Sequence, residues 1–377
     1  MTHEMSTRRV SCVDGTAREP DALRVLVVDD SVVMRQLISR ILSDHPLCEV
    51  AGSARNGAEA LDKVAILKPD IVTLDIEMPV LGGLEALRLI KERHPEVRVI
   101  MCSSLTAQGA SITIDALLSG ADDYVTKQHS GEMNAHAYDS LKDSLFAKVK
   151  AIATKRAGKK PGSANPAERQ TVYVAQGTSQ STYRELSLDR PRVLTIGVST
   201  GGPVALADLL PRIPAGFRLP ILIVQHMPPL FTQMLAERLS KLSQIPVKEG
   251  VDGMEVVPGC AIIAPGNYHM RVVSRAGVPA VALSQDPHEN SCRPAVDVLF
   301  RSVAEVYGGA TLAVVLTGMG QDGLEGARAL KGRGARVFAQ DQRTSVVWGM
   351  PGAVVAAQLA DAVVPLQEMC PAIMRHI

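Results

Sequence analysis

The chain has 377 residues, of which 46% are hydrophobic and 21% charged, and its formal net charge is +1. The length suggests two or three globular domains, and a nearly neutral chain with 3% aromatic residues does not favour nucleic-acid binding. The six cysteines form no CxxC pair, so neither a zinc site nor a disulfide framework is indicated, and a reducing cytoplasm fits best.

The N-terminal residues 1–22 contain "STRR" but no apolar core of a signal peptide. We therefore predict a disordered extension there. No apolar run in the chain approaches the roughly 18 residues of a membrane span, so membrane insertion is not expected.

Residues 23–150 alternate between short apolar runs and amphipathic stretches. This alternation predicts a parallel sheet of five strands covered by helices on both faces, a flavodoxin-like α/β domain. A last helix is expected at 133–152. The five predicted strands are "LRVLVVDD", "EVAGSA", "DIVTLD", "VRVIMCSS" and "DDYVTK".

Polar residues follow several of these strands at their carboxyl ends. Asp29 and Asp30 end the first strand and Asp75 the third, while Ser103 and Lys127 stand at the ends of the fourth and fifth. Such ends meet at one rim of a parallel sheet. Clustered carboxylates need a counter-charge, which Mg²⁺ supplies, and the lysine can pair with an anion such as a phosphoryl group. A single acid of this kind would more often cap a helix.

The stretches "VLVVDDS", "PDIVTLDIEMPVLGGLEAL" and "GADDYVTK" resemble the receiver domain of two-component response regulators over about 23–127. The resemblance implies that Asp75 accepts a phosphoryl group from a histidine kinase. Asp29, Asp30 and Asp75 would hold Mg²⁺ with help from the backbone carbonyl of Glu77.

The same resemblance implies that Ser103 senses the phosphoryl oxygen and that Lys127 pairs with it. The sequence departs from the receiver pattern at Gln128, where that family usually has proline. The family resemblance therefore does not extend to the geometry of this loop or to the switch behaviour that depends on it.

Residues 151–190 are rich in Pro, Gly, Ser and basic residues, as in "KRAGKKPGSANPAERQ". This composition predicts a flexible linker. Its "KRAGKK" cluster is more typical of a solvated spacer than of a nucleic-acid contact, and no helix-turn-helix pattern follows it.

A second alternating series fills residues 191–377 and predicts a doubly wound, Rossmann-like α/β domain. The predicted strands are "RVLTIGVS", "PILIVQH", "CAIIAP", "AVALSQ", "TLAVVLTG" and "RVFAQD".

The turn "GVSTGG" after the first of these strands satisfies G-x-S-x-G and would project Ser199 outward. On its own the motif is more often a plain tight turn. It lacks the Gly-Lys-Ser/Thr of a P-loop and the second glycine of a dinucleotide site. His226 ends the next predicted strand, and Asp322 follows "TLAVVLTG" on the same rim, where it could instead cap a helix.

Together these three residues suggest a Ser-His-Asp triad: a nucleophile, its base and a carboxylate that fixes the imidazole tautomer. Backbone N–H groups of the glycine-rich turns could form an oxyanion hole. The chain order Ser, His, Asp differs from that of α/β-hydrolases, so an ordinary lipase fold is not expected.

This half resembles the catalytic domain of the CheB family of protein-glutamate methylesterases, through "GVSTGGP", "IVQHMPPLFTQMLAERL", "RPAVDVLFRSVAEVYG" and "VLTGMGQDG". The resemblance implies hydrolysis of glutamate γ-methyl esters on methyl-accepting chemoreceptors, with deamidation of receptor glutamines. The Met319 amide would donate to the oxyanion, and no cofactor is expected in this half. Arg293, Pro294 and His269 receive no role, and Cys292 is interpreted as a packing residue.

The family resemblance also implies that the unphosphorylated receiver covers the esterase face and that phosphorylation at Asp75 favours an open form. An alternative from a different class is an output domain that only binds, with an inert triad. Labelling of Ser199 by a serine-directed reagent would distinguish the two.

Overall fold

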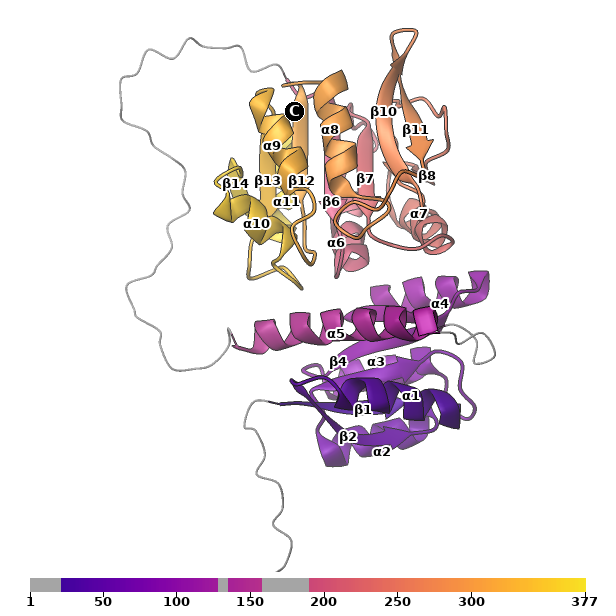
Figure 1. Ribbon diagram of the computed structural model, residues 1–377. Coiled ribbons are helices and arrows are strands. Elements are labelled where there is room, and N and C mark those ends of the chain that lie inside the picture. Colours follow the sequence, from indigo (N-terminus) through magenta and orange to yellow (C-terminus); the bar gives the residue numbers. More distant parts are fainter. Residues whose placement is uncertain (1–21, 128–134, 158–189) are drawn as a thin grey trace, which may run out of the picture.

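The computed structural model describes residues 22–127, 135–157 and 190–377, which form two α/β units (Figure 1). Residues 1–21 of the predicted extension at 1–22, Gln128 and most of the predicted linker at 151–190 lie outside the described residues.

Within residues 22–157, the described strands form one parallel five-stranded sheet in the order β2-β1-β3-β4-β5. This confirms the predicted flavodoxin-like arrangement. The elements are β1 (Leu23–Val28), α1 (Val32–Ser43), β2 (Cys48–Ala54), α2 (Gly57–Leu67), β3 (Ile71–Asp75), α3 (Gly83–Arg93), β4 (Arg98–Ser104), α4 (Ala107–Leu118), β5 (Asp123–Lys127) and α5 (Ala135–Ala157).

Local sequence explains why these helices begin where they do. The side chains of Ser31, Asn56 and Thr106 each accept a hydrogen bond from a backbone N–H in the first turn of α1, α2 and α4. The central strands β1 and β3 are almost fully buried, as expected for a sheet covered on both faces. Helix α5 continues to Ala157, seven residues into the stretch predicted as linker.

The second unit contains a parallel seven-stranded sheet in the order β14-β13-β12-β6-β7-β9-β8 within the described residues. Its strands are β6 (Val193–Val198), β7 (Ile221–Gln225), β8 (Val247–Glu249), β9 (Ala261–Ile263), β12 (Thr311–Val315), β13 (Arg336–Gln340) and β14 (Ala362–Val364). Its helices are α6 (Gly202–Leu209), α7 (Phe231–Leu242), α8 (Val296–Val306), α9 (Leu324–Gly332), α10 (Met350–Ala356) and α11 (Leu366–Met374), with a 3-10 turn at Leu210–Arg212.

One predicted strand of the second sheet belongs elsewhere. The run "AVALSQ" lies in β11 (Val278–Ser284), which pairs antiparallel with β10 (His269–Arg275) as a separate hairpin. The turn residues Ala276 and Gly277 have φ angles of 50° and 85°, as a two-residue hairpin turn requires. This tight turn leaves no room for the helix that a parallel crossover would need.

The two units touch through α4 and β5 of the first unit and α6 and α7 of the second. Helix α4 packs against α6 and α7, and Figure 1 shows α4 and α5 between the five-stranded sheet and the second unit. Asp115 of α4 forms an ion pair of 3.1 Å with Arg238 of α7. Tyr124 of β5 stacks on Phe231 of α7, with ring centroids 5.0 Å apart.

Among the helices in the described parts of the chain, none combines the length and apolar character needed to cross a membrane.

Candidate functional site

The carboxyl ends of β1 and β3 bring three acids together. Asp29, Asp30 and Asp75 each offer an oxygen within 4.8 Å of the others, and Asp29 and Asp75 are buried. Oxygen ligands on opposite sides of a Mg²⁺ ion are about 4.2 Å apart. The cluster therefore needs only a small adjustment to hold this cation, and its donor set fits the metal.

Lys127 provides positive charge to this cluster. Its Nζ lies 2.9 Å from Asp29 Oδ2 and 2.6 Å from Asp75 Oδ1. Burial raises the pKa of Asp75 to about 6, because the attraction of Lys127 does not fully offset burial and the repulsion of Asp29. A second cation at this rim would favour the ionised carboxylate.

Ser103 stands at the end of β4, where it was predicted, but its hydroxyl is bonded to α4. The Oγ atom lies 3.2 Å from the carbonyl oxygen of Gly109 and accepts a 2.7 Å hydrogen bond from Thr113. Ser103 is fully buried. Glu77, whose carbonyl was predicted to face a metal, follows β3 in an exposed loop.

The turn around Ser199 shows why glycines surround it. Gly201 has a φ of 77°, which side chains disfavour. A Cβ atom on Gly318 would lie 2.9 Å from the Cβ of Ser199, so the two turns approach too closely for a larger residue. Within the described residues the Ser199 hydroxyl forms no hydrogen bond, although its backbone N–H donates to Thr317.

His226 and Asp322 meet as predicted. His226 Nε2 lies 2.7 Å from Asp322 Oδ2, and both side chains are largely buried. Because an ionised carboxylate only accepts hydrogen bonds, the proton belongs on Nε2 and Nδ1 remains the basic nitrogen. Burial lowers the pKa of His226, but the hydrogen bonds with Asp322 and Cys292 more than reverse this and raise it.

Asp322 is held by several backbone groups. Its Oδ2 accepts the N–H of Val296, and its Oδ1 accepts those of Asp297 and Gly323. Burial alone would raise the pKa of Asp322, but the hydrogen bond with His226 and these N–H groups lower it. Asp322 thus anchors the first turn of α8 in addition to facing the histidine.

Met319 lies between Gly318 and Gly320 on the turn that approaches Ser199. In the part of the chain that the structure describes, its backbone N–H has no hydrogen-bond acceptor, whereas the N–H of Gly318 donates to Val347. An unpaired N–H beside a candidate nucleophile is what an oxyanion hole requires.

Sequence reasoning missed Gln225. This buried side chain donates from Nε2 to the carbonyl oxygens of Ser199 at 3.0 Å and His226 at 3.3 Å. Its Oε1 is buried without a donor among the described residues, close to Gly202. The glutamine next to the histidine in "IVQH" was the available signal, but sequence does not show which way a strand-end amide points.

Cys292 does more than fill space, contrary to its interpretation as a packing residue. Its Sγ lies 3.5 Å from His226 Nδ1, the nitrogen that would act as base. Arg293, which received no role, bonds to Asn267 and to two backbone carbonyls, and His269 bonds to the loop at Pro287. These two residues hydrogen-bond the loops near the candidate residues His226 and Asp322.

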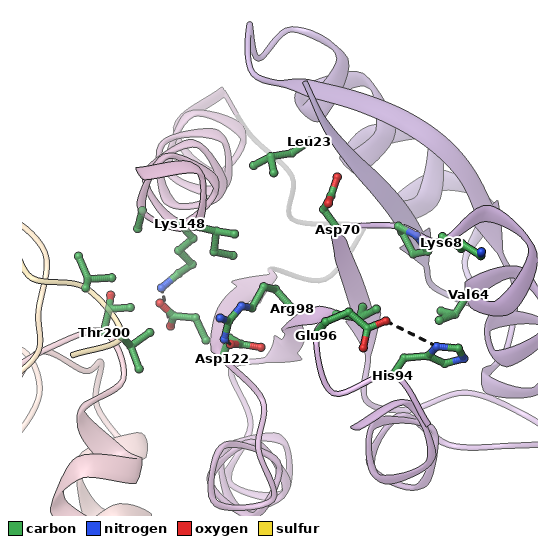
Figure 2. Close-up of a pocket in the computed structure, with 17 residues that line it drawn as sticks. Leu23, Val64, Lys68, Asp70, His94, Glu96, Arg98, Asp122, Lys148 and Thr200 are labelled. Atoms are coloured by element: carbon green, nitrogen blue, oxygen red, sulfur yellow. Dashed lines mark hydrogen bonds and ion pairs between the residues drawn. The ribbon is translucent and has the colours of Figure 1, made fainter. Parts of the chain in front are cut away.

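A cavity of about 460 Å³ lies between the two units and reaches the turn at Thr200. Thr200, the neighbour of Ser199, lines it with Val346 and Val347 of the loop after β13. The opposite wall comes from the first unit and includes Lys148 of α5 and Asp122, which precedes β5 (Figure 2). The rim that carries Ser199 therefore faces the first unit.

Two family descriptions match the chain. Residues 194–373 match the family described as CheB methylesterase, and residues 25–137 match the response regulator receiver domain.

Two relatives match the chain over nearly its whole length. The chain is 45% identical to a protein-glutamate methylesterase/protein-glutamine glutaminase of Trichodesmium erythraeum, over 94% of this chain and 99% of the relative. It is 47% identical to a protein of the same name from a Nocardioides species, over 94% of this chain and 95% of that protein. A solved structure of the Thermotoga maritima CheB methylesterase catalytic domain is 42% identical over 50% of this chain and 99% of that one, with a TM-score of 0.49.

Proposed function

The chain belongs to the family of CheB methylesterases that carry a response regulator receiver domain, and we propose that phosphorylation of Asp75 controls hydrolysis at Ser199. The enzyme is a protein-glutamate methylesterase and protein-glutamine glutaminase that acts on chemoreceptors in chemotactic adaptation. We assign the receiver to residues 23–150 and the catalytic domain to 191–377.

Ser199 is the nucleophile in this proposal. His226 Nδ1 takes the proton of the Ser199 hydroxyl as its oxygen attacks the γ-carbonyl carbon of the methyl ester, and returns it to the departing methanol. His226 Nδ1 then takes a proton from water as the water oxygen attacks the serine ester, and returns it to the Ser199 oxygen as the glutamate carboxylate leaves. Asp322 fixes the proton on Nε2 and stabilises the imidazolium, as the 2.7 Å contact supports.

The amide of Met319 is the oxyanion donor, since its N–H is unpaired within the described residues and its turn approaches Ser199. With glutamine as substrate the same steps release ammonia. The Cys292 thiol must leave Nδ1 before that nitrogen can serve Ser199, because both contacts use the same lone pair.

In the receiver, Asp75 takes the phosphoryl group from a histidine kinase, and the carboxylates of Asp29, Asp30 and Asp75 hold Mg²⁺ with the carbonyl of Glu77. A Mg²⁺ ion held there would supply positive charge that offsets the charge developing on the transferred group. Lys127, already 2.6 Å from Asp75, pairs with the phosphoryl oxygens. The receiver family supports the kinase partner, and the acidic cluster supports the metal.

Gating rests on the cavity between the domains. An α-helix with side chains is about 10–12 Å across, so three turns of a receptor helix need well over 1,000 Å³. The cavity of about 460 Å³ beside Thr200 is smaller than this, and the first unit forms its opposite wall, so the domains must separate before a receptor helix can lie against the turn that carries Thr200.

Ser103 links the phosphoryl site to this interface. Its hydroxyl is bonded to Thr113 and Gly109 of α4, and α4 packs on α6 and α7 of the catalytic domain. A phosphoryl group on Asp75 competes for the Ser103 hydroxyl and loosens α4 from that position. The population then shifts toward the open form.

The test is methanol release from methylated chemoreceptor membranes, for wild type and Ser199→Ala, with and without a small phosphoryl donor and Mg²⁺. We expect release that the donor stimulates and that Ser199→Ala abolishes. Release that survives Ser199→Ala would refute the triad, and release that ignores the donor would refute the gating.

A further inference from the structure

Asp322 has a second buried carboxylate as its neighbour. Asp297, in the first turn of α8, is 2% exposed, as is Asp322. The side chain of Asn290 lies between them. Its Nδ2 is 2.9 Å from Asp322 Oδ1 and 2.9 Å from Asp297 Oδ2.

We propose that Asn290 is a positioning residue for hydrolysis, whose carboxamide keeps two adjacent buried carboxylates ionised so that Asp322 remains an anion directed at His226. This inference rests on the proposed roles of Ser199, His226 and Asp322. No part of the sequence pattern around the triad assigned a role to Asn290.

The remaining oxygens of the two acids are already committed. Asp322 accepts backbone N–H groups and His226, and Asp297 Oδ1 accepts the N–H of Gly326 at 2.6 Å. The gap between the acids therefore requires a donor with two hydrogens and no acceptor pointing inward, which an amide NH₂ supplies. A lysine there would add charge and compete with His226 for Asp322.

The other charged groups nearby do not replace the amide. Arg301, the nearest cation on α8, is engaged by both oxygens of Glu289 at 2.6 Å each. The remaining titratable neighbours are His226 and the Cys292 thiol on the far side of the imidazole. Burial raises the pKa of Asp297, and Asp322 and Glu289 add to that effect. Asp297 is therefore the carboxylate that would accept a proton when one binds to the Asp297–Asp322 pair.

Loss of the amide has a pH signature. The two carboxylates would share a proton as pH falls, and the pair would titrate as a unit. The shared proton removes the charge that orients His226, so activity falls most at low pH. At high pH both acids ionise again and much of the activity returns.

The experiment compares kcat and KM of the full-length, phosphorylated enzyme for methanol release between pH 5.5 and 9. In Asn290→Gly the backbone is unstrained, because glycine accepts the φ of 52° found there. We expect kcat to fall about tenfold or more at the acid end, as for the loss of a hydrogen bond to a charged group, with KM unchanged. The deficit should shrink as pH rises.

The decisive comparison makes the Asn290→Gly substitution in a protein that already carries Asp297→Asn. Without the second carboxylate the bridge is unnecessary, so Asn290→Gly should cost little in that variant. Asn267→Gly is a matched control, since Asn267 has a similar φ of 65° but its carboxamide contacts Arg293. Any loss there should be the same at every pH.

A deficit of Asn290→Gly that is independent of pH and undiminished by Asp297→Asn would overturn the inference and leave Asn290 a structural residue. Asn290→Ser, whose hydroxyl has a single hydrogen and cannot bridge both carboxylates, should keep most of the pH-dependent deficit, and full recovery of kcat by serine would also contradict the inference. Activity retained by Ser199→Ala would instead overturn the triad on which the inference rests.

Discussion

The two parallel sheets place acids at the same edge but treat their charge in opposite ways. At the receiver rim, Lys127 pairs with Asp29 and Asp75 but not with Asp30, so the three carboxylates are not fully neutralised by the lysine. At the catalytic rim, backbone N–H groups, an amide and His226 surround Asp322. An under-neutralised cluster attracts a cation, whereas a fully bonded carboxylate can only orient its partner.

The largest effect is expected from removing the charge of Asp322, the carboxylate whose hydrogen bonds are complete. Asp322→Asn should lower kcat for methanol release by about 10⁴-fold, because the histidine loses its correct tautomer. Since Asp322 helps raise the pKa of His226, the acid limb of the pH profile should move to lower pH. An unchanged limb would mean that another group sets it.

The corresponding change at the receiver rim should leave chemistry intact and remove control. Asp75→Asn cannot accept a phosphoryl group, so the donor should no longer stimulate methanol release, while release without donor persists. The measurement is the ratio of rates with and without donor, with phosphorylation of the protein followed separately. Stimulation that survives would place the acceptor at another residue.

A smaller effect separates stability from activity at the catalytic rim. Gln225→Leu removes the amide that contacts the carbonyls of Ser199 and His226, together with the buried Oε1 that has no donor among the described residues. We expect kcat to fall about tenfold while the free energy of unfolding changes by less than about 1 kcal/mol. A large loss of stability by denaturant titration would make Gln225 a structural residue.

The smallest effect concerns the contact between the two regions. Asp115→Arg faces Arg238 with a like charge and should raise unphosphorylated activity a few-fold, since an exposed ion pair contributes about 1 kcal/mol or less. Arg238→Asp in the same chain should restore the low rate and serves as the control. Equal rates in all three proteins would show that this pair does not hold the domains together.

Most of the fold could be predicted from sequence, because parallel strands are continuous apolar runs with helices between them. All five receiver strands were predicted in this way. The run "AVALSQ" was misplaced because a buried half of a hairpin also reads as a short apolar strand, and the turn at Ala276 and Gly277 was overlooked.

The triad residues could be placed on one rim by their position after strands, but their supporting residues could not. Gln225 and Asn290 act through amide orientation, and Asn290 is 32 residues from its partner Asp322. The role of Cys292 depends on a turn between elements that has no periodic pattern. The ends of strands can be predicted from sequence, but the contacts of these side chains depend on loop conformations that only tertiary packing defines.

The loop after β13, whose Val346 and Val347 line the interdomain cavity, also carries Trp348, the single tryptophan of the chain. Its indole N–H donates to the carbonyl of Gln340 at the end of β13, so the ring is anchored to the catalytic domain. Light absorbed at the red edge of the protein spectrum therefore excites one fluorophore, next in sequence to Val347 of the interdomain cavity. Its emission gives an unlabelled optical signal for separation of the domains in real time.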